Sequence, residues 1–259
     1  MASSNNAPAS EPDFFGKIGE AFQLINASWD ALKLNISTFI LVVLVPAFVV
    51  MAASLFFLLP AFFSENGSNT ATALSSFVAF IVMVAALVVA LIFLPAITIT
   101  QLASARGKKV AFGEVFEESK QFVLRYIGLV LLGALVAGAP LILSFLLIFV
   151  IIGIFLIPLA VAWAMVVAFF LVVAPFILID KNLGVVDSIK ASYELTKKHW
   201  QWVLAIFVVN FVIGLPQIVP VIGWVISLVL SIAYFCLPAI IYVTKFSKTK
   251  SLAKEAKTK

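Results

Sequence analysis

The feature that most constrains this sequence is a series of six apolar stretches, each about as long as a lipid bilayer is thick. A helix of about 20 apolar residues spans a hydrocarbon core of roughly 30 Å. The chain is 64% hydrophobic and only 11% charged, too few charges to cover a water-soluble fold. The sequence therefore predicts an all-α protein, a polytopic bundle of six transmembrane helices. The expected spans are residues 36–60, 75–98, 126–149, 155–178, 200–218 and 222–243.

Glycines and prolines indicate where neighbouring spans separate. The third and fourth stretches form one apolar block, which we expect to break near 151–158, where Gly153 and Pro158 interrupt the pattern. The fifth and sixth are separated by Pro216, Pro220 and Gly223, which favours a tight turn.

The lysines and arginines indicate the orientation of the spans. All 17 lie before the first span, between the second and third, between the fourth and fifth, or after the sixth. The three opposite turns contain none, and their one acidic residue is Glu65. Because cytoplasmic loops carry the excess of basic residues, the pattern predicts a cell-membrane protein with both termini in the cytoplasm. The basic residues are Lys17 and Lys33, then Arg106, Lys108, Lys109, Lys120 and Arg125, then Lys181, Lys190, Lys197 and Lys198, and finally Lys245, Lys248, Lys250, Lys254, Lys257 and Lys259.

The chain divides into three parts. Residues 1–13 are expected to form a disordered N-terminal segment, 14–245 the membrane domain, and 246–259 a basic cytoplasmic tail. The start of the chain lacks the basic residues and short apolar core of a cleaved signal peptide, so we expect it to be retained.

Three segments before the odd-numbered spans are amphipathic, with apolar residues recurring every three or four positions. This periodicity predicts α-helices with one apolar stripe. Next to spans, such helices are expected to lie in the cytoplasmic interface as elbows. The alternative is a short loop helix packed on the bundle. The stripes are Phe15, Ile18, Phe22, Ile25, Trp29 and Leu32, then Phe112, Val115, Phe116, Phe122, Val123 and Tyr126, then Val186, Ile189, Tyr193 and Trp200.

These elbows suggest an internal repeat of elbow, span, span in three copies. An offset of 164 residues pairs Ser28 with Ser192 and Trp29 with Tyr193, and an offset of 94 pairs Pro46 with Pro140. Near the cytoplasmic ends of the second, fourth and sixth spans stand Pro95, Pro175 and Pro238.

The stretch 175–200, PFILIDKNLGVVDSIKASYELTKKHW, places a proline near the end of a span. An acidic residue follows, and then an alanine- and serine-rich amphipathic helix that ends in tryptophan. This pattern resembles the membrane domain attached to some bacterial glycerophosphoryl diester phosphodiesterases, and similar stand-alone bacterial membrane proteins, over roughly residues 14–245. The resemblance implies a six-helix membrane domain but not the hydrolase, because nothing here matches the soluble catalytic domain. It rests on Pro175, Asp180, Ser188, Ala191, Ser192, Thr196 and Trp200, with Ala27–Asn35 (ASWDALKLN) as the corresponding first elbow.

Residues able to carry chemistry are few. A metal-dependent phosphodiester hydrolase needs histidines and clustered carboxylates, and the one histidine, His199, lies at a membrane boundary, where we interpret it as a solvated side chain. Glu114, Glu117 and Glu118 are interpreted as a solvated helix face, and Cys236 as packing in an apolar helix. The sequence therefore predicts no enzyme, no cofactor and no metal site.

Aromatic and basic residues near the membrane boundaries are the candidate lipid contacts, because indole rings favour the headgroup level and lysines attract anionic headgroups. We also expect Trp163 and Trp224 near the opposite edge. The tail has no arginine, and after Phe246 no aromatic residue, so nucleic acid is not an expected partner. The candidates are Trp29, Lys33, Lys197, Lys198, Trp200 and Trp202.

Among the few polar residues inside the spans, Asn210 is the candidate for an intramembrane polar contact. It is expected to bond to another helix or to line a substrate path, and Pro46, Pro140 and Pro216 are expected to be tolerated kinks. The leading prediction is a non-enzymatic scaffold that contacts lipids, other membrane proteins or a second copy, and that organises the membrane or the assembly of the envelope. The alternative is a small-solute channel or transporter.

Overall fold

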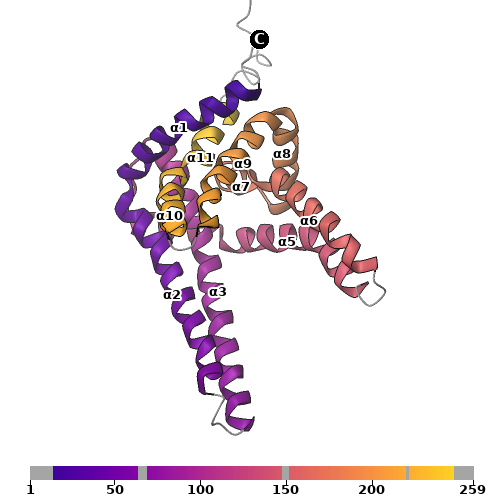
Figure 1. The fold of residues 1–259 in the computed structure, drawn as a ribbon. Helices are drawn as coiled ribbons and strands as arrows, with labels where there is room; N and C mark the ends of the chain where they lie inside the picture. The colour runs from indigo at the N-terminus through magenta and orange to yellow at the C-terminus, as the bar shows by residue number, and fades with distance from the viewer. Residues whose placement is uncertain (1–13, 64–68, 148–151, 220–221, 248–259) are drawn as a thin grey trace, which may run out of the picture.

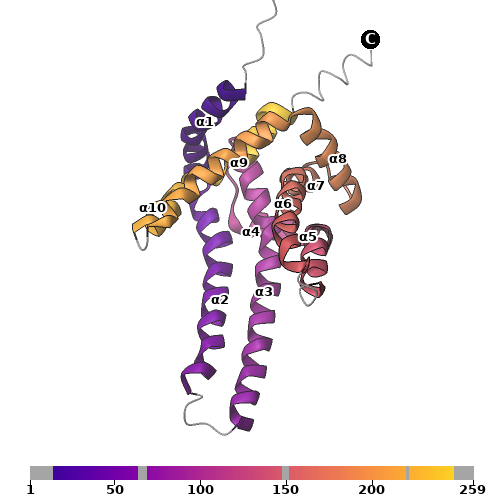
Figure 2. The ribbon, with the colours of Figure 1, turned by 45° about the vertical axis from the view of Figure 1, so that its right-hand side comes forward.

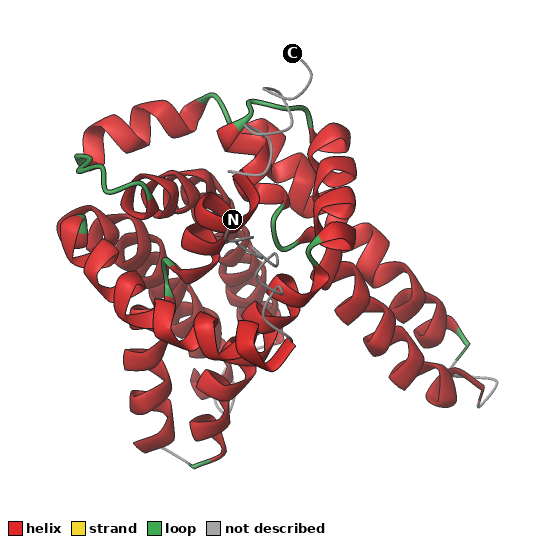
Figure 3. Cartoon of the chain, turned by 90° about the horizontal axis from the view of Figure 1, so that it is seen from above, coloured by secondary structure: helices red, strands yellow, loops and turns green. Residues whose placement is uncertain are grey.

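The computed structural model describes residues 14–63, 69–147, 152–219 and 222–247, and the regular structure within these ranges is helical throughout (Figures 1 and 3). The predicted segment 1–13 and most of the predicted tail lie outside them. In chain order the elements are α1 (Phe14–Leu34), α2 (Ile36–Phe63), α3 (Asn69–Ala105), α4 (Phe112–Lys120), α5 (Val123–Leu146), α6 (Ile152–Leu171), α7 (Ala174–Asp180), α8 (Val185–Lys198), α9 (Trp200–Gly214), the 3₁₀ turn η3 (Leu215–Ile218), α10 (Ile222–Tyr234), α11 (Leu237–Ile241) and the π-helical segment η4 (Tyr242–Ser247).

Six helical stretches are long and apolar enough to cross a membrane, which confirms the predicted number of spans. They pair as three hairpins, α2 with α3, α5 with α6, and α9 with α10. One predicted break is displaced, because α6 begins at Ile152 and carries Pro158 inside it. The stretches are Ile36–Leu55, Ser76–Ala105, Val123–Leu146, Ile154–Asp180, Trp200–Ile218 and Ile226–Ser247.

The third hairpin turns where the sequence places its prolines and glycine. Pro216 lies in η3 and Gly223 in the first turn of α10, while Pro220 lies outside the described residues. A side chain at Gly223 would stand 1.6 Å from the carbonyl oxygen of Pro216. Glycine is therefore required for α10 to pack this closely against η3.

The hairpins do not form the single bundle that the sequence suggests. The pair α2–α3 runs downward and α5–α6 runs to the right (Figure 1), while α9–α10 projects to the left once the molecule is turned (Figure 2). In the most apolar stretch of each span only 11–39% of the residues are buried within the chain. Most of the apolar hairpin surface is therefore left for lipid or for another protein to cover.

The core lies where the three hairpins meet. The second helix of each hairpin contributes its last turns to this base, as the end of α3, α7, and α11 with η4. These segments contact one another there, α3 with α7 and with α11. Side chains fully buried at the base include Ile177, Leu178, Leu237 and Ile241.

The described lysines and arginines all lie around this base. They belong to α1, α4, α8, the first turn of α5, η4, and the loops that follow α3 and α7. The molecule thus has a basic end and apolar hairpins, as the charge pattern predicts.

The helices that precede the hairpins pack in a cyclic order. Helix α4 packs on α3 of the hairpin before it, and α8 packs on α6 and α7. Helix α1 has no hairpin before it and packs instead on α9, α10 and α11 of the last one. Lys17 Nζ donates to Gln201 Oε1 at 2.6 Å, Lys245 pairs with Glu20, and the Cys236 amide donates to Ser28 Oγ at 3.1 Å. The first helix therefore closes a ring with the end of the chain.

Two of the repeated prolines start new helical segments. Pro175 and Pro238 each stand in the first turn of a short helix, α7 and α11, whereas Pro95 lies inside α3. Helices α3 and α7 also end alike, in a left-handed residue, Gly107 at φ 68° or Asn182 at φ 50°. In each cap the amide of the residue that follows, Lys108 or Leu183, donates to the carbonyl five residues before it. This is the pattern of a Schellman cap.

Candidate lipid-facing surface and intramembrane groove

Helix α1 packs on the core through small residues together with leucine and isoleucine side chains, and turns aromatic residues outward. Ala21, Ser28 and Leu32 are fully buried. Phe15 and Trp29 are 77% and 40% exposed, and with Phe22 they recur every seven residues, which places them on one side of the helix. The aromatic part of the predicted stripe therefore faces away from the protein.

Helix α8 repeats this arrangement. Ser188, Ser192 and Thr196 are fully buried at intervals of four, while Val186 and Tyr193 are 53% and 47% exposed. The Ser192 hydroxyl donates to the carbonyl of Phe170 at 2.6 Å, just before the break between α6 and α7. Its partner in the predicted repeat, Ser28, contacts Cys236 at the break between α10 and α11. The paired serines thus contact equivalent breaks in two hairpins.

Helix α4 is oriented the other way. Val115 and Ser119 are buried, and Phe116 packs on Phe93 of α3 with ring centroids 5.6 Å apart. The three glutamates of α4 are exposed, and the carboxylate of Glu114 accepts the Ala111 amide at 3.3 Å at the start of the helix. Of the two interpretations from sequence, α4 fits the loop helix packed on the protein.

Several of the predicted lipid-contact residues lie on the outer surface. Trp29 is exposed with Lys33 Nζ 5.9 Å above its ring, and Lys197 and Lys198 are exposed at the end of α8. Trp200 is exposed and stacks on Phe14 at 6.3 Å.

Trp202 differs from the other candidates. It is 6% exposed, and Lys245 Nζ lies 4.6 Å above its ring. Its ring therefore packs inside the base and does not face lipid.

Of the two tryptophans expected at the opposite edge, the structure describes the side chain of Trp163. The Trp163 indole donates to the carbonyl oxygen of Val136 at 2.9 Å. That carbonyl is one turn before Pro140, which lacks the amide that would bond to it in an unbroken helix. Trp163 thus ties α6 to α5 at the proline, while the side chain of Trp224 lies outside the described residues.

A polar junction at the base, missed from sequence, joins the ends of all three hairpins. Asp180 at the end of α7 pairs with Arg106 after α3 and accepts the hydroxyl of Tyr242 in η4 at 2.9 Å. Tyr242 is fully buried and stacks on Phe176 at 5.8 Å. Pro95, Pro175 and Pro238 could have indicated this junction from sequence. Each precedes the end of one of the three hairpins that meet here.

Two residues between an elbow and its hairpin occupy matching places. Asn35 is buried and donates to Ser104 Oγ at 2.9 Å and to the carbonyl of Lys108 at 2.8 Å, so it holds the loop after α3. Its partner in the 164-residue repeat, His199, packs its ring 5.3 Å from that of Phe246, after the third hairpin. His199 is therefore a packed, half-exposed residue at the base.

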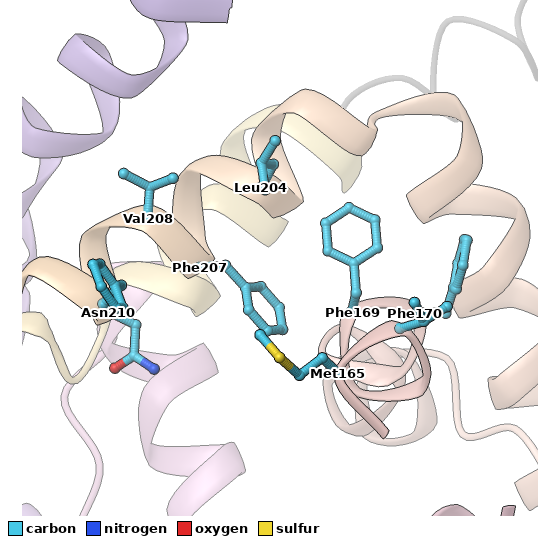
Figure 4. Close-up of a pocket in the computed structure, with 9 residues that line it drawn as sticks. Met165, Phe169, Phe170, Leu204, Phe207, Val208 and Asn210 are labelled. Carbon is cyan, nitrogen blue, oxygen red and sulfur yellow. The ribbon is translucent and has the colours of Figure 1, made fainter. Parts of the chain in front are cut away.

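An apolar groove of about 630 Å³ lies between α6 and α9 (Figure 4). Met165, Phe169 and Phe170 line it from α6, and Leu204, Phe207 and Phe211 line it from α9. Asn210 also lines the groove, is exposed, and forms no bond to another helix within the part of the chain that the structure describes. The expected bond from Asn210 to another helix is thus not made among these residues.

Among the described residues, no three histidine, cysteine, aspartate or glutamate side chains lie together in a group that could hold a metal ion. Cys236 is fully buried at the start of α11. Compared with known proteins, the chain matches no family model, no curated protein and no solved structure. The resemblance to the phosphodiesterase membrane domain therefore stays a prediction.

Proposed function

We propose that this multi-pass membrane protein is a non-enzymatic scaffold that binds and organises lipids, with α1 and α8 lying as elbows in the cytoplasmic interface. The observation that carries the proposal is the outward row of apolar side chains on each of these two helices. The large apolar side chains that these helices turn outward need another apolar environment, and the headgroup–acyl boundary is the one next to a span.

The charges beside these rows support the same assignment. Lys33 lies one turn after Trp29, and Lys190, Lys197 and Lys198 lie on α8 with Tyr193. Near an anionic leaflet each lysine contributes on the order of 1 kcal/mol of attraction. An elbow with aromatic residues in the acyl boundary and lysines at the headgroups would hold anionic lipid around the base of the hairpins.

The diverging hairpins give such a scaffold a large lipid-contacting area. Because most of each span is exposed, acyl chains or the spans of other envelope proteins must cover it. Phospholipid and other membrane proteins are therefore the partners that we propose.

The test is native mass spectrometry of the protein released from vesicles of mixed anionic and zwitterionic lipids. For a variant with Lys33, Lys197 and Lys198 changed to glutamine, we expect fewer retained anionic lipids and an unchanged number of zwitterionic ones. The matched control changes three exposed lysines on and before α4, whose aromatic face is turned inward, to glutamine and should retain the parent's lipids. These are Lys108, Lys109 and Lys120. Equal loss in both variants would contradict the role of the elbows.

Two other activities would overturn the proposal. Hydrolysis of glycerophosphodiesters by the purified protein would make it an enzyme. Solute flux in proteoliposomes that is lost in Asn210→Leu, while the variant still folds, would favour the small-solute channel or transporter.

A further inference from the structure

Asn210 lies in a membrane span with its amide uncovered. It is about 15 Å along α9 from Trp200, at 1.5 Å per residue, within the span Trp200–Ile218. Its side chain is exposed and forms no hydrogen bond with any residue that the structure describes. Hydrocarbon offers neither donors nor acceptors, so an amide at this depth requires a partner from outside the chain.

Other polar side chains in the spans show how the fold usually meets this requirement. Ser54 and Ser144 bond to carbonyls one turn earlier in their own helices, and Ser227 bonds to the carbonyl of Ile213 across its hairpin. The Asn210 amide has no such bond to the described residues, and it lines the end of the groove that is farther from Phe169 and Phe170 of α6 (Figure 4).

The surface around Asn210 suits the approach of a helix. Phe211 is 70% exposed beside it, and the groove next to it is apolar. One turn further along, Gly214 has open space where a side chain would stand, so a second backbone can come close.

A carboxamide is complementary to itself, because it carries two donor hydrogens and an acceptor oxygen. Two copies of α9 related by a twofold axis can therefore satisfy both amides at once, in the kind of interface that a symmetric dimer uses. A lipid acyl chain can fill the apolar groove but supplies no hydrogen bond.

We propose that the outer face of α9 is a self-association surface, on which the Asn210 amides of two copies pair and Phe211 of each copy enters the groove of the other. This inference requires only that α9 lies in the membrane, so it stands apart from the proposed scaffold function.

The first test is oxidative cross-linking in membranes of Gly214→Cys, which lies one turn along α9 from Asn210 and leaves the amide in place. Cys236 is fully buried, so the parent chain serves as the blank. We expect a disulfide-linked dimer in at least tenfold excess over Leu87→Cys, an exposed control on α3 of another hairpin. Cross-linking no greater than that of Leu87→Cys would overturn the proposal.

The second test measures self-association in vesicles by energy transfer between labelled copies as lipid dilutes the protein. Asn210→Leu should raise the apparent dissociation constant by about 3- to 30-fold, the range expected for one hydrogen bond between helices in a membrane. Asn210→Gln, which keeps an amide, should retain much of the affinity. A leucine variant that associates like the parent would overturn the proposal, and so would a monomer that carries lipid in the groove.

Discussion

In α5, Pro140 has no amide hydrogen, so the carbonyl of Val136 has no donor within its own helix. The indole of Trp163 on α6 supplies that donor. In a membrane an unbonded carbonyl is costly, so one side chain compensates for the proline and joins the two helices of the hairpin. The position of Trp163 therefore has a local cause that needs no headgroup.

This pairing predicts a non-additive effect of two substitutions. Trp163→Phe should destabilise the protein by about 0.6–1.7 kcal/mol, the measured range for hydrogen bonds within membranes. In a Pro140→Ala background the restored amide can bond to Val136, so the same substitution should cost less. A double-mutant cycle of unfolding free energies in mixed micelles measures the difference, and equal costs in the two backgrounds would count against the pairing.

Asp180 is the residue on which the three hairpin ends converge. Asp180→Ala would leave Arg106 and Tyr242 without their shared acceptor. Because hydrogen bonds to charged groups contribute about 1.5–3 kcal/mol each, we expect a loss of stability of that order, visible as a lower melting temperature. Glu194→Ala, at an exposed position on α8, is the control and should melt like the parent. If the two variants melt alike, the junction does not hold the base together.

At the scale of elements, α1 and α8 pack on the core through small residues together with leucine and isoleucine side chains, and turn other large apolar residues outward. The buried serines lie on helices that approach the core closely, where a larger side chain has no room. The outward residues are only partly covered by the chain, as for Tyr193, whose ring lies 4.9 Å from that of Phe170. The buried and the exposed face should therefore respond differently to a larger side chain.

Ser192→Leu should destabilise the protein, because it inserts a large side chain into a filled space and removes the bond to Phe170. Overpacking costs typically about 1–3 kcal/mol. Val186→Leu, at an exposed position on the same helix, should change stability little. Unfolding free energies of the two variants measure this, and similar losses would mean that both faces of α8 are packed.

The spans were predictable because the cost of a charge in hydrocarbon dominates every local preference. Long apolar runs free of charge therefore predict transmembrane helices, and the helices of the structure coincide with these runs. The predicted position of the break between α5 and α6 was less accurate. Pro158 is tolerated inside α6 and so does not mark the start of that helix.

The orientation of the elbow faces could not be predicted from the same pattern. Periodicity shows that α1, α4 and α8 each have an apolar stripe, but it does not tell whether protein or lipid covers the stripe, since both are apolar. Phe116 packs on α3, whereas Phe15 and Trp29 face outward. The groove at Asn210 was beyond the sequence for a related reason, because it depends on how α6 and α9 diverge.

At the scale of the whole molecule, three hairpins leave a common base that carries the described basic residues, and the first helix closes that base against the last hairpin. From the polarity of charge we predict that all the hairpin tips lie on one side of the membrane and that the elbows lie on the opposite, cytoplasmic side.

Sided labelling of single cysteines with a membrane-impermeant thiol reagent tests this arrangement most directly. Cysteines would replace Asn66 and Gln217, in the turns of the first and third hairpins, and Lys109 and Lys190 at the base. We predict that reagent outside intact cells labels the first two, and that the other two react only after the membrane is opened. Labelling of turn and base positions from the same side would contradict the three paired crossings.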